Sequence, residues 1–174
     1  MLFRSGELLA ALRDAGTVAA ILLPNDPNVV LAAGAAAALA EGMEVRIVPT
    51  RTMQEGIAAL LAMDPRLAPD ENADRMERAA GAIASIAVTE AAREARIDGR
   101  RLRAGQAIAV DPHDRILAAG EDRLTVAVEA ITELGLDPEL VTVHYGAGVS
   151  PREGMLLAER IERAFPDAAV EVAD

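Results

Sequence analysis

Apolar positions along the chain recur with helical and strand periods that change character twice, which divides it into segments 1–68, 69–120 and 121–174. The first segment alternates helix and strand patterns. It predicts a helix over 5–15, a strand over 18–23, a helix over 27–40, a strand over 44–48 and a helix that begins after Thr52. Strands and helices in this order are typical of a parallel sheet with right-handed crossovers.

The middle segment follows a different pattern. It predicts a polar helix over 70–80 and then strands over 83–89 and 106–110, with turns at Ile97-Asp98-Gly99-Arg100 and Asp111-Pro112-His113-Asp114. Asp-Gly between two strand patterns is a strong hairpin signal. We therefore expect an antiparallel meander here.

The third segment returns to the first pattern, with a helix over 122–134, a strand over 140–145, a helix that begins after Ser150 and a strand over 169–172. Residues 18–48 and 140–172 are thus similar strand–helix–strand units. We predict an α/β fold in a single domain 1–174. Its mostly parallel sheet is built from these two units with helices packed on it, and it is interrupted by the antiparallel β-meander.

Composition narrows the chemistry of this fold. Hydrophobic residues make up 52% of the 174 residues but aromatic ones only 2%, and 38 residues are alanine, which predicts close packing of helices on the sheet. All 17 basic residues are arginine, so a Schiff-base or phosphate-binding lysine is excluded. The absence of cysteine excludes a disulfide and a thiolate nucleophile. A net charge of −11 with few aromatics argues against nucleic acid as a partner.

The apolar runs carry no signal for export or membrane insertion. The N-terminal residues MLFRSGELLAALRDAG place a charge in nearly every turn, unlike a signal peptide. The longest apolar run, Val29 to Ala40, has 12 residues and is too short to span a bilayer. We therefore expect a cytoplasmic location without membrane insertion.

Polar side chains gather in the loops that come after the predicted parallel strands. Such loops meet at one edge of an α/β sheet, where ligands usually bind. We therefore predict a cleft that binds a ligand or partner by hydrogen bonds rather than by proton transfer. Its residues are Asn25, Asn28, Thr50, Thr52, Gln54, His144 and Tyr145.

Phosphate binding is an alternative at the third loop, which contains Gly146-x-Gly148 before a helix. However, the helices that come after the three loops carry carboxylates at the cap or in the first turn, at Asp26, Glu55 and Glu153. A carboxylate there binds the same amides and the same positive helix end that a phosphate would need. We favour plain turn geometry.

The two histidines suggest metal or acid–base chemistry. His113 lies in Asp-Pro-His-Asp, a composition that is ordinary for a chain reversal, and we expect no metal there. His144 is the candidate general base of a rival hypothesis, a small-molecule enzyme, which a buried pocket with a carboxylate beside His144 would support. No Ser, Cys or second His is spaced to complete a triad, so we predict no catalytic residue.

Five arginines form the one basic cluster of this acidic chain: Arg93, Arg96, Arg100, Arg101 and Arg103. They fit a docking surface for an acidic partner or a phosphate-bearing ligand. Interleaved with Glu94 and Asp98, they fit a solvated hairpin face equally well. The sequence leaves both interpretations open.

Several runs resemble one protein family, in order, along nearly the whole chain. They are ILLPNDPNVVLAA (21–33), RIVPTRTMQEGIAALLAMDP (46–65), ENADRMERAA (71–80), AIASIAVTEAAREARIDGRRLRAGQAIAV (82–110) and ELVTVHYGAGVSPREGMLLAERIERAFPDAAVEV (139–172). They are similar to the C-terminal, DegV-like region of the bacterial fatty acid kinase A-subunit family. That family is related to dihydroxyacetone kinases through its N-terminal, DhaL-like nucleotide domain. The residues before Ser5 and the end at Asp174 depart from the family pattern.

The resemblance implies part of a longer kinase-like protein, in which ATP and Mg²⁺ are held by a nucleotide domain that this chain lacks. It therefore implies no cofactor in this chain and no activity of the chain alone. The implied role is to dock or regulate a DegV-like fatty-acid-binding protein, or the upstream kinase domain, in fatty acid phosphorylation. A second copy of the chain, as a homodimer, is a further candidate partner. The alternative is a small-molecule or acyl-chain binding protein or enzyme that uses the strand-end cleft at His144.

Overall fold

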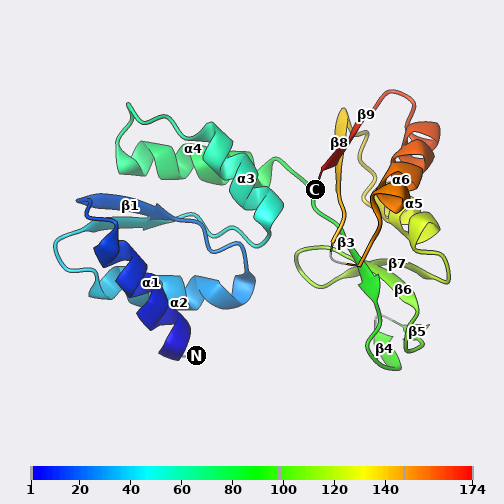
Figure 1. The fold of residues 1–174 in the computed structure, drawn as a ribbon, viewed down its shortest axis with the longest axis horizontal. Coiled ribbons are helices and arrows are strands. Elements are labelled where there is room, and N and C mark those ends of the chain that lie inside the picture. Colours follow the sequence, from blue (N-terminus) through cyan, green and yellow to red (C-terminus); the bar gives the residue numbers. More distant parts are fainter. Residues whose placement is uncertain (1, 98, 147, 174) are drawn as a thin grey trace. The chain divides into compact units, whose positions relative to one another are not determined.

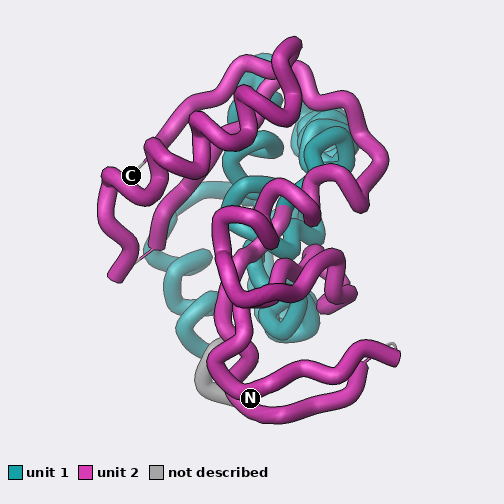
Figure 2. The backbone as a smooth tube through the Cα atoms, turned by 90° about the vertical axis from the view of Figure 1, so that its right-hand side faces the viewer, with its two compact units in different colours: residues 1–85 teal, residues 86–174 magenta. Residues whose placement is uncertain are grey.

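The computed structural model describes residues 2–97, 99–146 and 148–173. Asp98 of the predicted hairpin turn and Ala147 of the third loop therefore lie outside the described residues. The chain divides into two compact units, Met1–Ser85 and Ile86–Asp174 (Figure 2). The division falls inside segment 69–120, which the apolar pattern treats as one part. Each unit is described by itself.

The described part of unit 1 forms a helix-rich α/β arrangement. Its elements are α1 (Leu2–Asp14), β1 (Ala19–Leu22), α2 (Pro27–Leu39), β2 (Glu44–Ile47), α3 (Met53–Ala62) and α4 (Pro69–Gly81) (Figure 1). Strands β1 and β2 run parallel, with Ala19 opposite Glu44 and Leu22 opposite Ile47. The helix between them is therefore a crossover, as the order of the elements predicts.

Alternating side chains along β1 send apolar groups to both faces of this two-stranded sheet. Ala20 and Leu22 pack with α1 and α2, whereas Ile21 and Leu23 pack with α3 and α4. In Figure 1, α1 and α2 lie on one side of β1, and α3 and α4 lie on the other. The buried residues are Leu12, Ala36 and Ala40 on the first face, and Val48, Ala59, Met76 and Ala80 on the second.

Side-chain caps begin three helices at the predicted residues, Asp26, Thr52 and Ser150. Each side chain accepts a backbone N–H of the first turn, which would otherwise lack a partner. The acidic members of the two predicted capping boxes are engaged elsewhere. Glu55 accepts the N–H of Arg51 at 2.6 Å, and Glu153 forms an ion pair with Arg123 at 3.0 Å.

Unit 2 combines an antiparallel sheet, a hairpin and a second parallel pair. Its elements are β3 (Ala87–Glu90), β4 (Ala95–Ile97), β5 (Arg100–Leu102), β6 (Ala107–Val110), β7 (Ile116–Gly120), α5 (Arg123–Glu133), β8 (Leu140–His144), α6 (Pro151–Ala164) and β9 (Ala169–Ala173). The antiparallel sheet has the order β3-β6-β7, β4 and β5 form the hairpin, and β8 and β9 are parallel.

The antiparallel sheet of unit 2 is apolar on both faces. Ala107 and Ala109 of β6 belong to the cluster that packs against α5. Ile108 and Val110 pack on the opposite face, around Leu102 of the β4–β5 hairpin. Small side chains on one face allow α5 to approach the sheet closely, and the hairpin covers the other face.

Helix α6 packs on the parallel pair β8–β9 and contacts α5. Two ion pairs strengthen that contact. Arg160 Nη1 lies 2.6 Å from Asp122 Oδ2, at the cap of α5, and Arg123 of α5 lies 3.0 Å from Glu153 of α6. The second parallel unit is thereby joined to the helix that covers the antiparallel sheet.

The predicted α/β class is confirmed, with both strand–helix–strand units and the antiparallel meander in place. In the described part of the chain, the parallel strands form two separate pairs, one in each unit. The strand predicted over 83–89 begins only at Ala87, because Ser85 is bound in unit 1, where its hydroxyl lies 3.2 Å from that of Thr52. Helix α4, expected at the start of the middle segment, packs in unit 1 through Met76.

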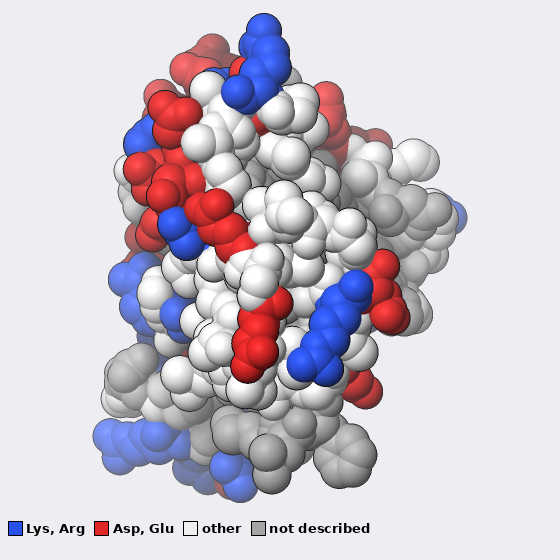
Figure 3. Space-filling model, turned by 90° about the vertical axis from the view of Figure 1, so that its left-hand side faces the viewer, with Lys and Arg blue, Asp and Glu red and all other residues white. Residues whose placement is uncertain are grey.

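Charged and apolar side chains share the surface unevenly. On the face drawn in Figure 3, charged side chains stand around a broad area that carries none. Several large apolar side chains of unit 1 are exposed, among them Leu31 at 78% and Leu61 at 83%. Within the residues that the structure describes, no helix combines the length and the apolar character needed to cross a membrane.

Candidate functional site

The strand-end loops of unit 1 meet through Asn25 and Thr50. The N–H of Asn25 donates to Thr50 Oγ1 at 3.1 Å, and the Thr50 hydroxyl donates back to Asn25 Oδ1 at 2.8 Å. Asn25 has a φ of 55°, a left-handed conformation that Asn tolerates better than most residues. The loop after β1 and the loop after β2 therefore lie at the same edge of the sheet, as the predicted topology requires.

A glycine of α3 makes room for this pair. A Cβ on Gly56 would overlap the side-chain amide of Asn25. Gly56 is buried, and Thr50 is only 1% exposed, whereas Asn25 itself is exposed. The Asn25 amide thus lies against the bare backbone of α3, with its outer side toward solvent.

The network extends to the start of α3 and the end of unit 1. Thr52 Oγ1 accepts the N–H of Glu55 at 3.2 Å and lies 3.2 Å from Ser85 Oγ. Sequence reasoning missed both Ser85 and Gly56. Neither forms a motif by spacing, and the one available signal for Gly56 is a glycine inside a helical pattern, which often marks a close approach.

Two other predicted cleft residues lie at these helix starts without joining the side-chain network. The backbone N–H of Asn28 donates to Asp26 Oδ1 at 2.8 Å, which is the cap of α2. The side chain of Asn28 is exposed, and Gln54 is half-buried in the first turn of α3. For both side chains, the role of binding a ligand or partner stays a prediction.

The chemistry of the unit 1 loops is that of hydrogen bonding. Hydroxyls and an amide face one another, and the carboxylates of Asp26 and Glu55 already accept backbone N–H groups at the starts of α2 and α3. The positive ends of these two helices are therefore compensated by the chain itself. An additional anion would have to displace those carboxylates, so the arrangement supports the preference for turn geometry over phosphate binding.

In unit 2, the strand end is arranged differently. His144 is the last residue of β8; its side chain is exposed and, within the described ranges, forms no hydrogen bond or ion pair. The observation that would have supported a general base, a carboxylate beside a buried His144, is not made in this part of the chain. Tyr145 is half-buried against α6, where a Cβ on Gly154 would come within 3.1 Å of Tyr145 Cδ1.

The predicted cleft residues thus fall into two groups in different units. Asn25, Thr50 and Thr52 form one connected network in unit 1. His144 and Tyr145 belong to unit 2. A joint cleft of both groups stays a prediction.

The His113 turn uses its acid to hold the chain reversal. Asp111 Oδ1 accepts the N–H of His113 at 2.8 Å and that of Arg115 at 2.9 Å. Asp111 also forms an ion pair with Arg115 at 3.1 Å. Across the described residues, no three His, Cys, Asp or Glu side chains are grouped so as to hold a metal ion.

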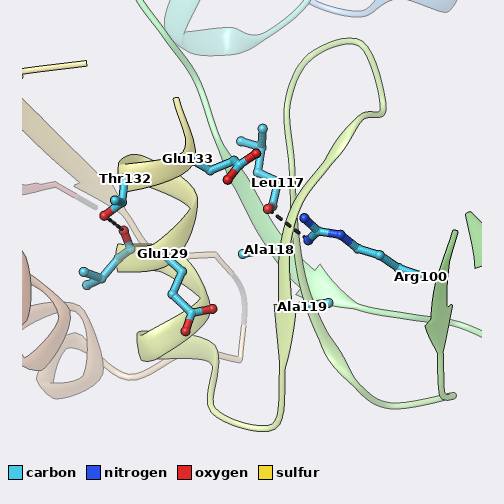
Figure 4. A pocket seen from close by; sticks show the side chains of 8 residues that line it. Arg100, Leu117, Ala118, Ala119, Glu129, Thr132 and Glu133 are labelled. Carbon is cyan, nitrogen blue, oxygen red and sulfur yellow. Dashed lines mark hydrogen bonds between the residues drawn. The ribbon is translucent and has the colours of Figure 1, made fainter. Parts of the chain in front are cut away.

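An open pocket of about 400 Å³ lies in unit 2 between the antiparallel sheet and α5 (Figure 4). Arg100 reaches it from β5 and donates to the carbonyl of Leu117 at 3.1 Å, while Glu129 and Glu133 approach it from α5. Because one guanidinium shares the pocket with two carboxylates, the pocket does not favour an anion. Sequence reasoning missed it, since the two glutamates read as an ordinary solvated helix face. Its lining is Arg100, Leu117, Ala118, Ala119, Val128, Glu129, Thr132 and Glu133.

The five arginines of the predicted basic patch are all exposed and lie on or beside the β4–β5 hairpin. Arg103 pairs with Glu121, and Arg101 lies 3.8 Å from Glu94. Arg93 and Arg96 form no ion pair with any described residue. The patch is therefore only partly neutralised by its own surroundings.

Comparison with protein families identifies one match that covers almost the whole chain. The family of FakA-like C-terminal domains, which is that of the fatty acid kinase A-subunit, matches residues 3–174. This span includes both units and every residue of the candidate sites described above.

Individual relatives agree with that match. Protein YloV of Bacillus subtilis is 28% identical over 167 residues, which is 95% of this chain and 30% of that protein. An uncharacterized protein of Staphylococcus haemolyticus is 30% identical over 152 residues, or 87% of this chain and 27% of that protein. An uncharacterized protein of Staphylococcus aureus (strain USA300) is 30% identical over 154 residues, or 88% of this chain and 28% of that protein. The chain spans less than a third of the length of these curated relatives.

Proposed function

Since this chain belongs to the FakA-like C-terminal family of fatty acid kinase, we propose that it is a non-catalytic domain that docks a DegV-like acyl-binding protein during fatty acid phosphorylation in the cytoplasm. The family match over residues 3–174 carries the proposal. The hydroxyl and amide network of Asn25, Thr50 and Thr52 supports it, because such groups bind a partner by hydrogen bonds without performing chemistry.

An exposed apolar face on α3 supports docking at the same place. Met53, Ile57, Leu60 and Leu61 have the spacing of one helix face, and they are between 43% and 83% exposed. Helix α3 begins directly after Thr52, so this face continues from the strand-end loops. Large apolar side chains gathered beside polar groups are typical of a protein interface. We propose that the partner covers the loops and the α3 face together.

Nucleotide binding belongs elsewhere in this proposal. The chain has no lysine, and the carboxylates of Asp26 and Glu55 bind the amides at the helix starts that a phosphate would use. Within the described residues, no acidic group is arranged to hold Mg²⁺. These donors do not fit ATP with Mg²⁺, and we propose that a separate nucleotide domain holds both.

Isothermal titration with a DegV-like acyl-binding protein from the same source tests the docking. We expect binding in about the micromolar range. Replacing Leu60 and Leu61 by Ser should weaken it by about tenfold or more, because apolar anchors carry most of the binding energy of an interface. The matched control replaces Leu31 and Leu39 of α2, which are also exposed, and should leave the affinity within about twofold.

Absence of binding, with and without the nucleotide domain, would overturn the docking proposal. Equal loss of affinity in the two double variants would overturn the assignment to α3. A fatty acid that co-purifies with this chain and is identified by mass spectrometry would instead favour the alternative, in which the chain itself binds the acyl group.

A further inference from the structure

The β4–β5 hairpin of unit 2 concentrates basic charge in an acidic protein. Residues 93–103 contain five arginines against two acids, whereas the whole chain has a net charge of −11. All five arginines are exposed. An isolated basic surface on an acidic chain is a local feature that long-range charge does not explain.

The pairing of the two strands sorts these arginines onto two faces. Leu102 is 2% exposed and faces the core of unit 2, and Arg100 donates to the carbonyl of Leu117 on that side. Side chains alternate along a strand, so Arg101 lies on the opposite, outer face. Arg101 is the direct cross-strand partner of Arg96. The outer face of the hairpin therefore presents two arginines side by side.

This arrangement is unfavourable for the hairpin alone. Like charges directly opposite each other on paired strands destabilise the pair. The compensation on the described part of the chain is one ion pair of Arg101 with Glu94 at 3.8 Å, between side chains that are 80% and 67% exposed. Such a pair contributes little, and Arg96 has none. An external anion would relieve the repulsion between Arg96 and Arg101.

The surroundings of the pair select the kind of anion. Residues 86–144 contain no Phe, Tyr or Trp on which a nucleic acid base could stack. The net charge of −11 also opposes approach to the long anionic surfaces of nucleic acids and membranes. A short acidic segment avoids that repulsion, and each guanidinium fork can bind a carboxylate through two hydrogen bonds.

We infer that the Arg96–Arg101 face of the β4–β5 hairpin, together with Arg93, binds an acidic, Asp- and Glu-rich segment of a partner protein. The inference does not depend on the docking proposed for unit 1, since it concerns a separate surface of unit 2.

Binding of a fluorescein-labelled poly-glutamate peptide to the full chain, followed by fluorescence anisotropy at low and high sodium chloride, tests the inference. Replacing Arg96 and Arg101 by Gln should weaken binding by about tenfold and reduce its salt dependence. The matched control replaces Arg78 and Arg152, which are exposed on helices α4 and α6, and removes the same charge. It should change the affinity by less than about twofold.

A single charge reversal separates binding from folding. Arg96→Glu places opposite charges across the strand pair, so we expect a hairpin at least as stable as the native one and a peptide affinity reduced by more than about tenfold. Equal losses of affinity in the hairpin and control variants would overturn the inference, as would the absence of binding at low salt. Tighter binding of a single-stranded oligonucleotide, or of phosphatidylserine vesicles, would also overturn it. None of these results bears on the titration with the DegV-like protein.

Discussion

The two parallel strand–helix–strand units, β1-α2-β2 and β8-α6-β9, share the same order of elements and differ at their strand ends. In the first, Asn25 and Thr50 bind each other across two loops and lie against Gly56 of the next helix. In the second, His144 is exposed and Tyr145 packs on Gly154 of the crossover helix itself. The same local pattern thus leads to a polar network in one unit and to an aromatic contact in the other.

The difference arises from the neighbouring elements that pack on each parallel pair. Helices α3 and α4 cover the second face of the β1–β2 sheet and bring Gly56 to the loop after β1. Unit 2 has α5 and an antiparallel sheet instead, and α6 contacts α5. A strand-end loop therefore acquires its chemistry from neighbouring elements, and four measurements can break or sharpen this comparison.

The substitution Gly56→Ala should have the largest effect. Its Cβ would overlap the Asn25 amide inside a buried contact, and we expect a loss of about 3 kcal/mol in the free energy of unfolding of unit 1. Gly34→Ala in α2 is the matched control, because a Cβ there meets no atom within 4 Å, and it should stabilise the protein by about 1 kcal/mol. Urea unfolding followed by circular dichroism measures both. Stabilisation by Gly56→Ala would break the comparison.

Removal of the Thr50 hydroxyl should have the next largest effect. In Thr50→Val, the Asn25 N–H and side-chain oxygen both lose their partner at a position that is 1% exposed. We expect a loss of about 2 kcal/mol by urea unfolding. Thr132→Val in unit 2 is the control, since that exposed hydroxyl donates only to the Val128 carbonyl of its own helix, and it should cost less than about 0.5 kcal/mol. Equal costs would mean that the network is not special.

A smaller effect is expected from Gly154→Ala, the unit 2 counterpart of the first substitution. The new Cβ would lie 3.1 Å from Tyr145 Cδ1 and 3.2 Å from Val172 Cγ1, so these side chains must move by a few tenths of an ångström. We expect a cost of about 1 kcal/mol. Tyr145 is the single tyrosine of a chain without tryptophan, so its fluorescence should change in Gly154→Ala and stay constant in Gly56→Ala. A change in both variants would contradict the separate roles of the two glycines.

The smallest effect is a dependence on pH in unit 2. The Thr125 hydroxyl and Arg160 both donate to the Asp122 carboxylate, and these bonds lower the pKa of Asp122 from 3.8 to about 2. Because the folded pKa lies below the unfolded one, the stabilisation is complete above about pH 4 and is lost as the pH falls through about 2.

Urea unfolding of the native chain, followed by Tyr145 fluorescence, should therefore show a falling free energy of unfolding between about pH 4 and pH 2. The variant Asp122→Asn keeps a capping side chain and should show a shallower fall. An identical slope in both proteins would exclude Asp122 as the titrating group.

Much of the fold could be predicted from local patterns. Asp26, Thr52 and Ser150 begin their helices as predicted, because a cap involves only the first turn of the helix that it starts. The meeting of the Asn25 and Thr50 loops was also predictable, since parallel strands connected by a crossover end at the same edge of a sheet. The antiparallel hairpin was indicated by Asp-Gly between two strand patterns.

The remaining features depend on contacts between residues far apart in the sequence. Gly56 lies against Asn25, Ser85 lies beside Thr52, and Arg100 binds the Leu117 carbonyl. No spacing rule connects these residues, because which helix face meets which loop depends on how whole elements pack. The sequence by itself determined the α/β order, the helix starts and the family, through periodic and short-range signals. Only the tertiary structure decided which polar groups are bound within the chain and which, like Arg96 and the apolar face of α3, stay exposed to a partner, because burial is a property of the packed units.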